Sequence, residues 1–314
     1  MRVATIDIGT NTVLLLVAEA RGRELVAVEE RATITRLGQG VDKTRTLAPD
    51  AVARTNACLD EYAKVIASYG AERVDVVGTS AMRDAAGGEV IREHVQRVLG
   101  VEARVIAGEE EARLTFTGAL VGLSGALQGS GATVFDIGGG STEVVQGRVD
   151  ADAGAGVDDA RIAFARSYDV GSVRMTERHV RSDPPTLAEL AAIRQDVERI
   201  VDSLPPLSSA NAEPVGIAGT ITTLAAVSMA LDPYDSGRVH GARLDVDALE
   251  AVVMRLAAMP LEARRTVPGL EPKRADVIVA GGLVAVTLLR RWGARALVVS
   301  DRGVRWGLAL ALCK

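Results

Sequence analysis

One short pattern occurs twice in this chain, about 130 residues apart, as TIDIGTNT and again as VFDIGGGST. In each copy an apolar strand ends on an aspartate, and glycine and hydroxyl residues follow at once. Glycine lets backbone N–H groups turn toward an anion without a Cβ in the way, and the hydroxyls supply further donors. A repeated supersecondary unit is typical of duplicated architecture. The repeat therefore predicts two similar halves that close on one phosphate chain.

Length and composition indicate a globular chain of two domains. At 314 residues the chain exceeds the size at which one hydrophobic core stops growing. Aromatic residues make up only 3% of it, which leaves few platforms for stacking single-stranded nucleic acid. The formal net charge of -5 argues against a general nucleic-acid or membrane surface. We therefore expect no nucleic-acid partner and no membrane partner.

Cysteine usage and hydropathy predict a soluble protein of the cytoplasm. Cys58 and Cys313 are the only cysteines, too few for a disulfide framework or a thiolate metal cluster. Asp7 and Asn11 interrupt the N-terminal apolar run, and no later run reaches about 18 uncharged apolar residues. The sequence thus indicates neither a signal peptide nor a membrane span.

The first half of the chain alternates between strand and helix patterns. Three strands are predicted within residues 3–34, and an amphipathic helix is predicted over 49–69. A strand at 75–78, a helix near 88–99, a short strand and a helix over 108–120 follow. This order predicts a mixed sheet flanked by helices. The Gly/Ser-rich segment 122–131 is expected to be a hinge or connection.

The second half repeats the order of the first. Strands are expected at 132–137, 143–146 and 161–168, with the polar stretch 150–159 as an exposed hairpin loop. Later strands are expected at 214–219 and 296–300. Helices are expected near 186–204, 219–231, 245–258 and 272–292, and a last short helix at the C-terminus.

Seven motifs give the chain a specific resemblance. In order they are DIGTNT, GTSAMRDA, GEEEARLTF, DIGGGSTE, AGTITTLAA, VPGLEPKRADVIVAGG and SDRGVRWG. Together they resemble the exopolyphosphatase and guanosine pentaphosphatase (Ppx/GppA) family, which belongs to the superfamily of actin, sugar kinases and heat-shock chaperones. The resemblance implies an α/β fold of two duplicated ribonuclease-H-like, or actin-like, domains, with mixed sheets flanked by helices and an interdomain cleft. Domain I would span 1–121 plus a C-terminal helix at about 301–314, and domain II would span 122–300.

The two repeated turns carry the expected metal and phosphate ligands. Mg²⁺ takes one or two carboxylates together with phosphate oxygens and waters, so Asp7 and Asp136 are its expected ligands, with Mn²⁺ as an alternative ion. Either aspartate taken alone could instead cap its turn. The residues expected to cradle the phosphates are Gly9, Asn11, Thr12, Gly138, Gly139, Gly140, Ser141 and Thr142.

The resemblance also assigns carboxylates to catalysis. Glu109, Glu110 and Glu111 lie together at a predicted helix start, and successive helical residues point about 100° apart, so all three cannot face one cleft. The catalytic glutamate of the family motif falls on Glu111, which would position the attacking water, and its two neighbours would be solvated. Glu143, directly after DIGGGST, resembles a second family carboxylate near the metal.

Two arginines match positions that the family uses around its phosphate channel. These are Arg83 and Arg274, and an arginine fork suits phosphate oxygens. Ser80 is expected to add a donor nearby. The remaining basic residues of the region are expected on the surface, namely Arg264, Arg265, Lys273, Arg290 and Arg291. The glycines of AGT and VAGG lie where superfamily relatives hold nucleotide, although close helix packing explains them equally well.

The resulting prediction is a Mg²⁺-dependent hydrolase that removes the terminal phosphate of inorganic polyphosphate by direct attack of water. The resemblance leaves guanosine pentaphosphate open as the substrate. Because longer relatives carry further C-terminal helical domains and this chain ends at Lys314, we expect short-chain polyphosphate, weak processivity or a nucleotide substrate. Two other readings are a small-molecule kinase and a non-catalytic sensor of polyphosphate or alarmone. A homodimer is expected from the resemblance and from the prevalence of two-fold assemblies.

Overall fold

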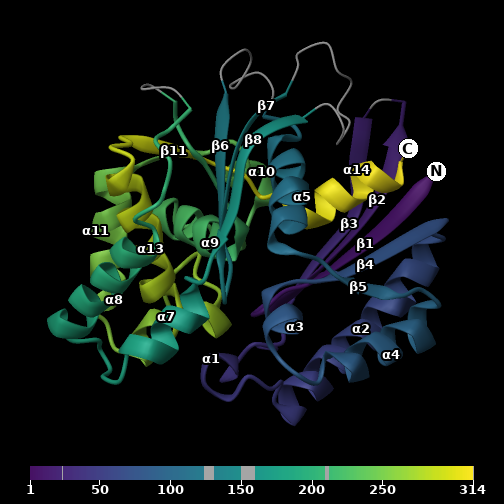
Figure 1. Ribbon diagram of the computed structural model, residues 1–314, viewed down its shortest axis with the longest axis horizontal. Coiled ribbons are helices and arrows are strands. Elements are labelled where there is room, and N and C mark those ends of the chain that lie inside the picture. The colour runs from purple at the N-terminus through teal and green to yellow at the C-terminus, as the bar shows by residue number, and fades with distance from the viewer. Residues whose placement is uncertain (23, 124–130, 150–159, 209–211, 314) are drawn as a thin grey trace. The chain divides into compact units, whose positions relative to one another are not determined.

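The computed structural model describes residues 1–22, 24–123, 131–149, 160–208 and 212–313 (Figure 1). The chain divides into two compact units. The described part of unit 1 comes from Met1–Val121, Val149–Arg161 and Gly303–Lys314, and that of unit 2 from Gly122–Arg148 and Ile162–Arg302. The expected hinge residues 124–130 and the expected loop 150–159 lie outside the described residues.

Unit 1 is built on a sheet with the strand order β3-β2-β1-β4-β5. The strands β1 (Arg2–Ile8), β2 (Thr12–Arg21) and β3 (Glu24–Ile34) form an antiparallel meander. The strands β4 (Arg73–Gly78) and β5 (Ala103–Val105) add to it in parallel with β1. The central strands are apolar and almost wholly buried, as expected for a sheet covered on both faces.

Helices connect and cover this sheet. They are α1 (Val41–Thr44), α2 (Pro49–Tyr69), α3 (Ser80–Asp84), α4 (Gly88–Leu99), α5 (Gly108–Leu120) and α14 (Val304–Leu312). Helix α2 spans the predicted residues, with Pro49 in its first turn and Leu59, Tyr62 and Ile66 buried in the core. Both cysteines are free, and burial raises the pKa of each thiol, which fits structural residues.

Unit 2 has a sheet with the strand order β10-β11-β9-β6-β7-β8. Strands β6 (Ala132–Ile137), β7 (Thr142–Val149) and β8 (Ala160–Tyr168) correspond to β1, β2 and β3. Strands β9 (Val215–Ile217) and β11 (Ala296–Val299) run parallel to β6 and correspond to β4 and β5. The short β10 (Arg243–Asp245) pairs antiparallel with β11 at the edge. The predicted pair of mixed sheets flanked by helices is thus confirmed.

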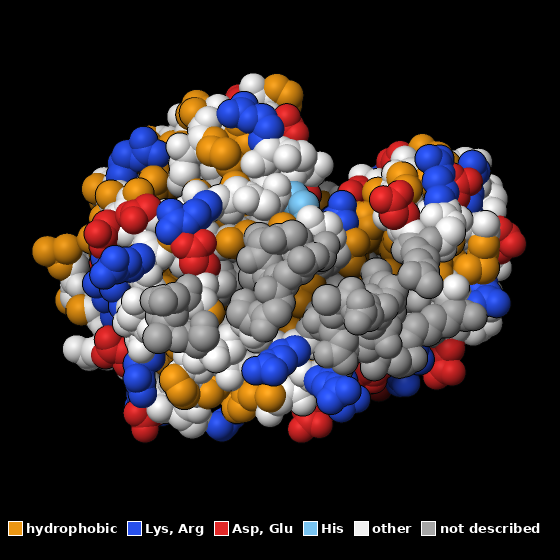
Figure 2. Space-filling view, turned by 90° about the horizontal axis from the view of Figure 1, so that it is seen from above, with side chains coloured by type: hydrophobic (Ala, Val, Ile, Leu, Met, Phe, Trp, Pro, Cys, Tyr) orange, Lys and Arg blue, Asp and Glu red, His pale blue; other side chains and the backbone are white. Residues whose placement is uncertain are grey.

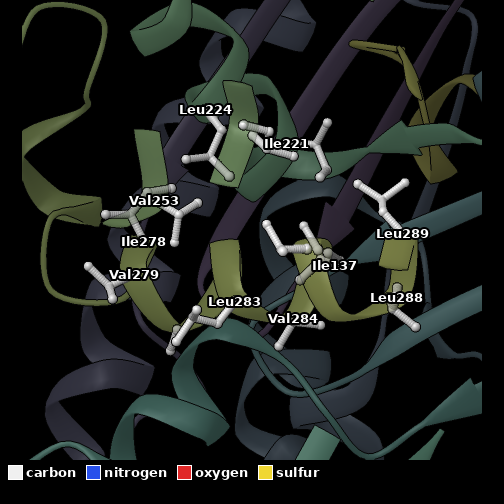
Figure 3. Close-up of a cluster of buried hydrophobic side chains, with 14 of the residues drawn as sticks. Ile137, Ile221, Leu224, Val253, Ile278, Val279, Leu283, Val284, Leu288 and Leu289 are labelled. Atoms are coloured by element: carbon white, nitrogen blue, oxygen red, sulfur yellow. The ribbon is translucent and has the colours of Figure 1, made fainter. Parts of the chain in front are cut away.

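The core of unit 2 lies between its sheet and helix α13, which is nearly all apolar. The helices are α7 (Ser172–His179), α8 (Leu187–Ile200), α9 (Ala218–Ser228), α10 (Ser236–Val239), α11 (Val246–Ala257), α12 (Leu261–Arg264) and α13 (Ile278–Arg291), with a 3₁₀ turn η2 (Pro272–Arg274). Figure 3 shows Leu283, Val284 and Leu288 of α13 among residues of α9, α11 and β6. Burial of this kind contributes about 25 cal/mol per Å² of apolar surface.

One predicted helix began too early, and several short elements were not predicted. The helix expected over 272–292 begins only at Ile278, because Pro272–Arg274 form a 3₁₀ turn that the Glu271 side chain caps at the Lys273 N–H. Helix α7 and strand β10 were not predicted. Both are short elements, and tertiary packing rather than local propensity decides whether such segments are regular.

The surface carries both signs of charge. Figure 2 shows Lys/Arg and Asp/Glu side chains interspersed on the face that it displays. Many form local ion pairs, such as the 2.8 Å pair between Arg290 and Glu250. None of the helices that the structure describes is both long and apolar enough to cross a membrane.

Candidate functional site

In unit 1 the predicted site residues lie at the carboxyl ends of three adjacent parallel strands. Asp7 lies near the end of β1, Ser80 and Arg83 follow β4 on α3, and Glu111 follows β5 on α5. Strands β1, β4 and β5 are hydrogen-bonded neighbours, so their carboxyl ends meet at one edge of the sheet. In open α/β sheets this edge is where ligands bind.

Arg83 and Glu111 form an ion pair at this edge. The Arg83 Nη1 lies 3.0 Å from the Glu111 Oε2 and also donates to the Ile106 carbonyl at 3.0 Å. The Glu111 residue is only 6% exposed. A buried carboxylate needs such a partner, because desolvation otherwise disfavours its ionised form. Arg83 therefore orients the Glu111 carboxylate and supplies the opposite charge that a buried carboxylate needs.

The three consecutive glutamates differ in burial. Glu109 and Glu110 are exposed, and Glu110 pairs on the surface with Arg104 at 2.8 Å. Only Glu111 turns into the protein. The helical spacing of about 100° per residue accounts for this difference. Ser80 is also buried, and its Oγ donates to the Asp84 Oδ2 at 3.1 Å.

The turn between β1 and β2 presents backbone donors. The Gly9 N–H donates to the Thr12 carbonyl at 3.1 Å, and the Asn11 carbonyl accepts from the N–H groups of Thr35 and Arg36. Within the described part of the chain, neither the Thr10 N–H nor the Asn11 N–H donates to a backbone carbonyl. Successive N–H groups of this kind form an anion-binding nest.

The turn between β6 and β7 repeats this arrangement in unit 2. The Gly138 N–H donates to the Ser141 carbonyl at 3.0 Å, as Gly9 does to Thr12. Here the N–H groups of Gly139, Gly140 and Ser141 donate to no backbone carbonyl of the described residues. The sequence repeat is therefore also a repeat of hydrogen bonding. Thr142 differs from the prediction in one respect, because its Oγ1 donates to the Val170 carbonyl at 2.6 Å inside the protein.

The backbone carbonyls of residues 137–140, called the glycine turn below, all accept hydrogen bonds from other parts of unit 2. The Ile137 carbonyl accepts from the Thr220 Oγ1 at 3.2 Å, and the Gly138 carbonyl accepts from the Ser172 N–H at 2.9 Å. The Gly139 carbonyl accepts from the N–H groups of Val173 and Arg174. With its carbonyls fixed by α7 and α9, the turn is preorganised and its remaining N–H groups keep one orientation.

Arg174 is a site residue that the sequence reasoning missed. Its side chain is 6% exposed, and its Nε donates to the Gly140 carbonyl at 2.6 Å. A buried arginine that bonds a backbone carbonyl in a ligand-binding turn acts on the geometry of that turn. The available signal was its place in the unassigned segment VGSVRMTE, between the repeat and α8.

Asp136 and Glu143 face each other across the β6–β7 pair. They are register partners in the antiparallel ladder, so their Cβ atoms belong to one face of the sheet. Glu143 is 1% exposed, and the Ser167 Oγ donates to its Oε1 at 2.6 Å. Ser167 was not predicted, since it lies 24 residues further along the chain.

Arg274 lies against the AGT motif of unit 2. A Cβ at Gly219 would overlap the Arg274 guanidinium group. Burial lowers the pKa of Arg274, while the Glu271 carboxylate opposes that change. Ala218, the residue before Gly219, has a φ of 65°, a left-handed conformation that L-residues adopt at some strain.

The VAGG glycines serve helix packing. A Cβ at Gly281 would lie 2.8 Å from the Thr220 Cγ2 and 2.9 Å from the Ser172 Cβ. Both neighbours are donors to the glycine turn, so this close approach also supports the site. Of the two explanations left open by the sequence, close packing describes this pair.

One of the arginines expected on the surface is buried. Arg264 is 3% exposed, and its Nη1 donates to the Ala275 carbonyl at 2.8 Å. Its Nη2 lies 3.3 Å from the Asp183 Oδ1. The prediction was wrong because both partners are distant in sequence. Arg265 and Arg290 are exposed, as expected.

The donor set fits a hard divalent cation only as part of a complex with substrate. Among the residues that the structure describes, no three His, Cys, Asp or Glu side chains are grouped to hold a metal. Each unit instead offers one aspartate at a strand end beside a turn of N–H and hydroxyl donors. Mg²⁺ is commonly bound in this manner, by one or two carboxylates together with substrate phosphates and waters.

Comparisons with known proteins agree on one family. A family model described as the Ppx/GppA phosphatase family matches residues 16–314. Exopolyphosphatase 2 of Mycobacterium tuberculosis is 41% identical over 328 residues, covering 99% of this chain and 98% of that protein. Exopolyphosphatase 1 of Mycobacterium bovis is 30% identical over 314 residues, covering 99% of this chain and 88% of that protein.

Solved structures match over the same length. The Aquifex aeolicus PPX-GPPA enzyme superposes with a TM-score of 0.80 at 34% identity and covers 99% of both chains. The crystal structure of an exopolyphosphatase-like protein gives a TM-score of 0.91 at 34% identity, covering 99% of this chain and 97% of that one. The two mixed sheets flanked by helices thus have the same fold as these proteins.

Proposed function

Because this chain belongs to the Ppx/GppA phosphatase family, we propose that it is an exopolyphosphatase that hydrolyses the terminal phosphoanhydride bond of inorganic polyphosphate. The observation that carries the proposal is the buried Glu111, held by Arg83 at the carboxyl edge of the unit 1 sheet. The names of the relatives at 41% and 30% identity support the same substrate class.

In the proposed reaction a water oxygen attacks the terminal phosphorus and the bridging P–O bond breaks, releasing orthophosphate and a chain one phosphate shorter. Glu111 accepts a hydrogen bond from the water and takes its proton as the new bond forms. The N–H groups of Asn11, Gly139 and Gly140 bind non-bridging oxygens, whose charge is largest in the transition state. Arg83 adds a cationic donor beside Glu111 in unit 1.

Mg²⁺, or Mn²⁺ in its place, would be held by Asp7 and Asp136 and would neutralise phosphate oxygen charge when bound. We propose that Glu143 acts beside Asp136 in unit 2, where the Ser167 hydroxyl fixes one of the Glu143 carboxylate oxygens. Ser80, Thr12, Ser141 and Thr142 complete the proposed set, with Thr142 supporting the turn from inside.

Guanosine pentaphosphate is the alternative substrate, because its 5′-phosphate presents the same terminal anhydride. We also propose that the protein prefers short polyphosphate and is a homodimer. The proposal further includes a cytoplasmic location and the division into two actin-like domains. The reading as a small-molecule kinase receives no support from the buried Glu111 beside Arg83.

The proposed activity is tested by phosphate release from tripolyphosphate, long-chain polyphosphate and guanosine pentaphosphate. We expect release from tripolyphosphate in the presence of Mg²⁺, and loss of that release when EDTA removes the metal, since phosphate charge is then not neutralised. Exclusive use of guanosine pentaphosphate would replace the polyphosphate assignment with the alternative. Tight binding without release from any of the three would favour the sensor.

Arg174→Met should raise KM for tripolyphosphate about tenfold with a smaller change in kcat. The substitution keeps an apolar stem but removes the donor to the Gly140 carbonyl, and a hydrogen bond to a charged group is worth about 1.5–3 kcal/mol. Arg194→Met is the matched control, because Arg194 pairs with Glu250 at the surface. Equal KM values for both variants and wild type would remove Arg174 from the site.

A further inference from the structure

The AGT motif of unit 2 is occupied by one of the protein's own arginines. A side chain at Gly219 is sterically impossible while the Arg274 guanidinium keeps its position, since a Cβ there would overlap three guanidinium atoms. The φ of Gly219 lies outside the left-handed region, so its backbone alone does not require glycine. The requirement for glycine therefore comes from the arginine.

The backbone on both sides of this contact is fixed. On one side, Ala218 adopts a left-handed φ of 65°, a conformation that persists only where the surroundings determine it. On the other side, the residue after Arg274 is fixed by Arg264, whose Nη1 donates to the Ala275 carbonyl at 2.8 Å. Arg264 is itself buried and lies 3.3 Å from Asp183. The Arg274 backbone is thus anchored independently of any ligand.

The contact also lies beside the glycine turn. Ile217 pairs in register with Asp136 across β9 and β6, and Thr220 donates to the Ile137 carbonyl at 3.2 Å. Gly219 lies between these two residues of the chain. A guanidinium seated on Gly219 therefore lies at the same sheet edge as the turn whose N–H groups are oriented for an anion.

We infer that Gly219 is a positioning residue: its lack of a side chain seats the Arg274 guanidinium at the carboxyl edge of the unit 2 sheet, where this arginine binds non-bridging oxygens of a linear phosphoanhydride. This inference rests on the proposed function. It gives the AGT motif a role that differs from holding a nucleotide, since the space over Gly219 is filled by the arginine. The arginine fork matches phosphate geometry and keeps its charge when buried.

The test is a double-mutant cycle of Gly219→Ala and Arg274→Ala in the full chain. KM and kcat for tripolyphosphate are measured, and tripolyphosphate binding is measured by calorimetry in the Glu111→Gln background. We expect Gly219→Ala alone to weaken binding about tenfold and to act on KM more than on kcat. In the Arg274→Ala background the same change should have an effect within about twofold of none. Gly237→Ala is the matched control, because the nearest atom to its Cβ is 3.4 Å away.

Thermal unfolding of the four proteins provides a second readout. If Gly219→Ala destabilises the protein, the loss should disappear in the Arg274→Ala background, because the overlapping group is gone. If Gly219→Ala weakens binding or lowers stability equally with Arg274 present and with Arg274→Ala, Gly219 does not position the Arg274 guanidinium. Absence of tripolyphosphate binding to the Glu111→Gln protein would overturn the phosphate assignment. Wild type could also fail to release phosphate while tripolyphosphate binding changes across the double-mutant cycle as expected. That result would refute the proposed hydrolysis and keep the positioning role of Gly219.

Discussion

Replacing Glu111 by glutamine is expected to lower kcat for phosphate release about 10³-fold while leaving KM nearly unchanged. A positioned general base contributes about 10²–10⁴-fold to rate, and glutamine keeps the shape and hydrogen-bonding length of the side chain without a proton-accepting carboxylate. The Arg83 Nη1 can still donate to the amide oxygen, so the fold and the phosphate turns should be preserved. The measurement is steady-state phosphate release with tripolyphosphate and Mg²⁺.

The chain supplies its own matched control for this experiment. Glu110→Gln makes the same chemical change on the adjacent residue, which is exposed and pairs with Arg104 on the surface. That pair is worth about 0–1 kcal/mol, so kcat should stay within about twofold of wild type. A large loss in Glu110→Gln with activity retained in Glu111→Gln would move the catalytic assignment to the neighbouring residue.

The repeat was the part of the sequence from which the fold could be predicted. Because the pattern of strand, aspartate, glycine and hydroxyl is local, it placed β1, β2, β6 and β7 and the two turns between them. The alternation of strands and helices predicted mixed sheets, and the structure shows which strands pair: β4 and β9 run parallel to the first strand of each half. Helical periodicity gave α2 and the start of α5, and it indicated that the three glutamates could not all face one cleft. The resemblance to the family motif singled out Glu111, which is the buried one of the three.

The parts of the site that could not be predicted are those made by backbone carbonyls and by distant partners. Arg174 bonds the Gly140 carbonyl, and a sequence does not indicate which carbonyl a side chain will meet. Arg264 has a polar, charged side chain that composition places on the surface, yet Asp183, 81 residues away, and a backbone carbonyl satisfy it when buried. The contact between Gly219 and Arg274 depends on a 3₁₀ turn that the helical pattern obscured.

The crossing of α5 and α14 in unit 1 leads to the second large prediction. Gly307 of α14 packs directly on the backbone of α5, since a Cβ there would lie 2.8 Å from both the Cα and the carbonyl carbon of Leu114. Gly118 returns the contact, because its Cβ would lie 2.8 Å from the Gly307 nitrogen. Leu114 is three residues after Glu111 on the same helix. The position of the proposed base thus depends on how closely these two helices approach.

Gly307→Ala should therefore lower the free energy of unfolding of unit 1 by about 2–3 kcal/mol, because a methyl group has no space against backbone atoms that cannot rotate away. Part of the strain is relieved by moving α5, so kcat should fall as well, while KM changes little. Thermal unfolding and phosphate release on the same preparation measure both effects. Gly88→Ala is the control: its Cβ would have no neighbour closer than 3.7 Å, and alanine is the better helix former, so it should be neutral or slightly stabilising. Gly307→Ala could instead match Gly88→Ala in both measurements. A methyl group would then fit between α5 and α14, and the position of Glu111 would depend on its contact with Arg83 and not on the helix crossing.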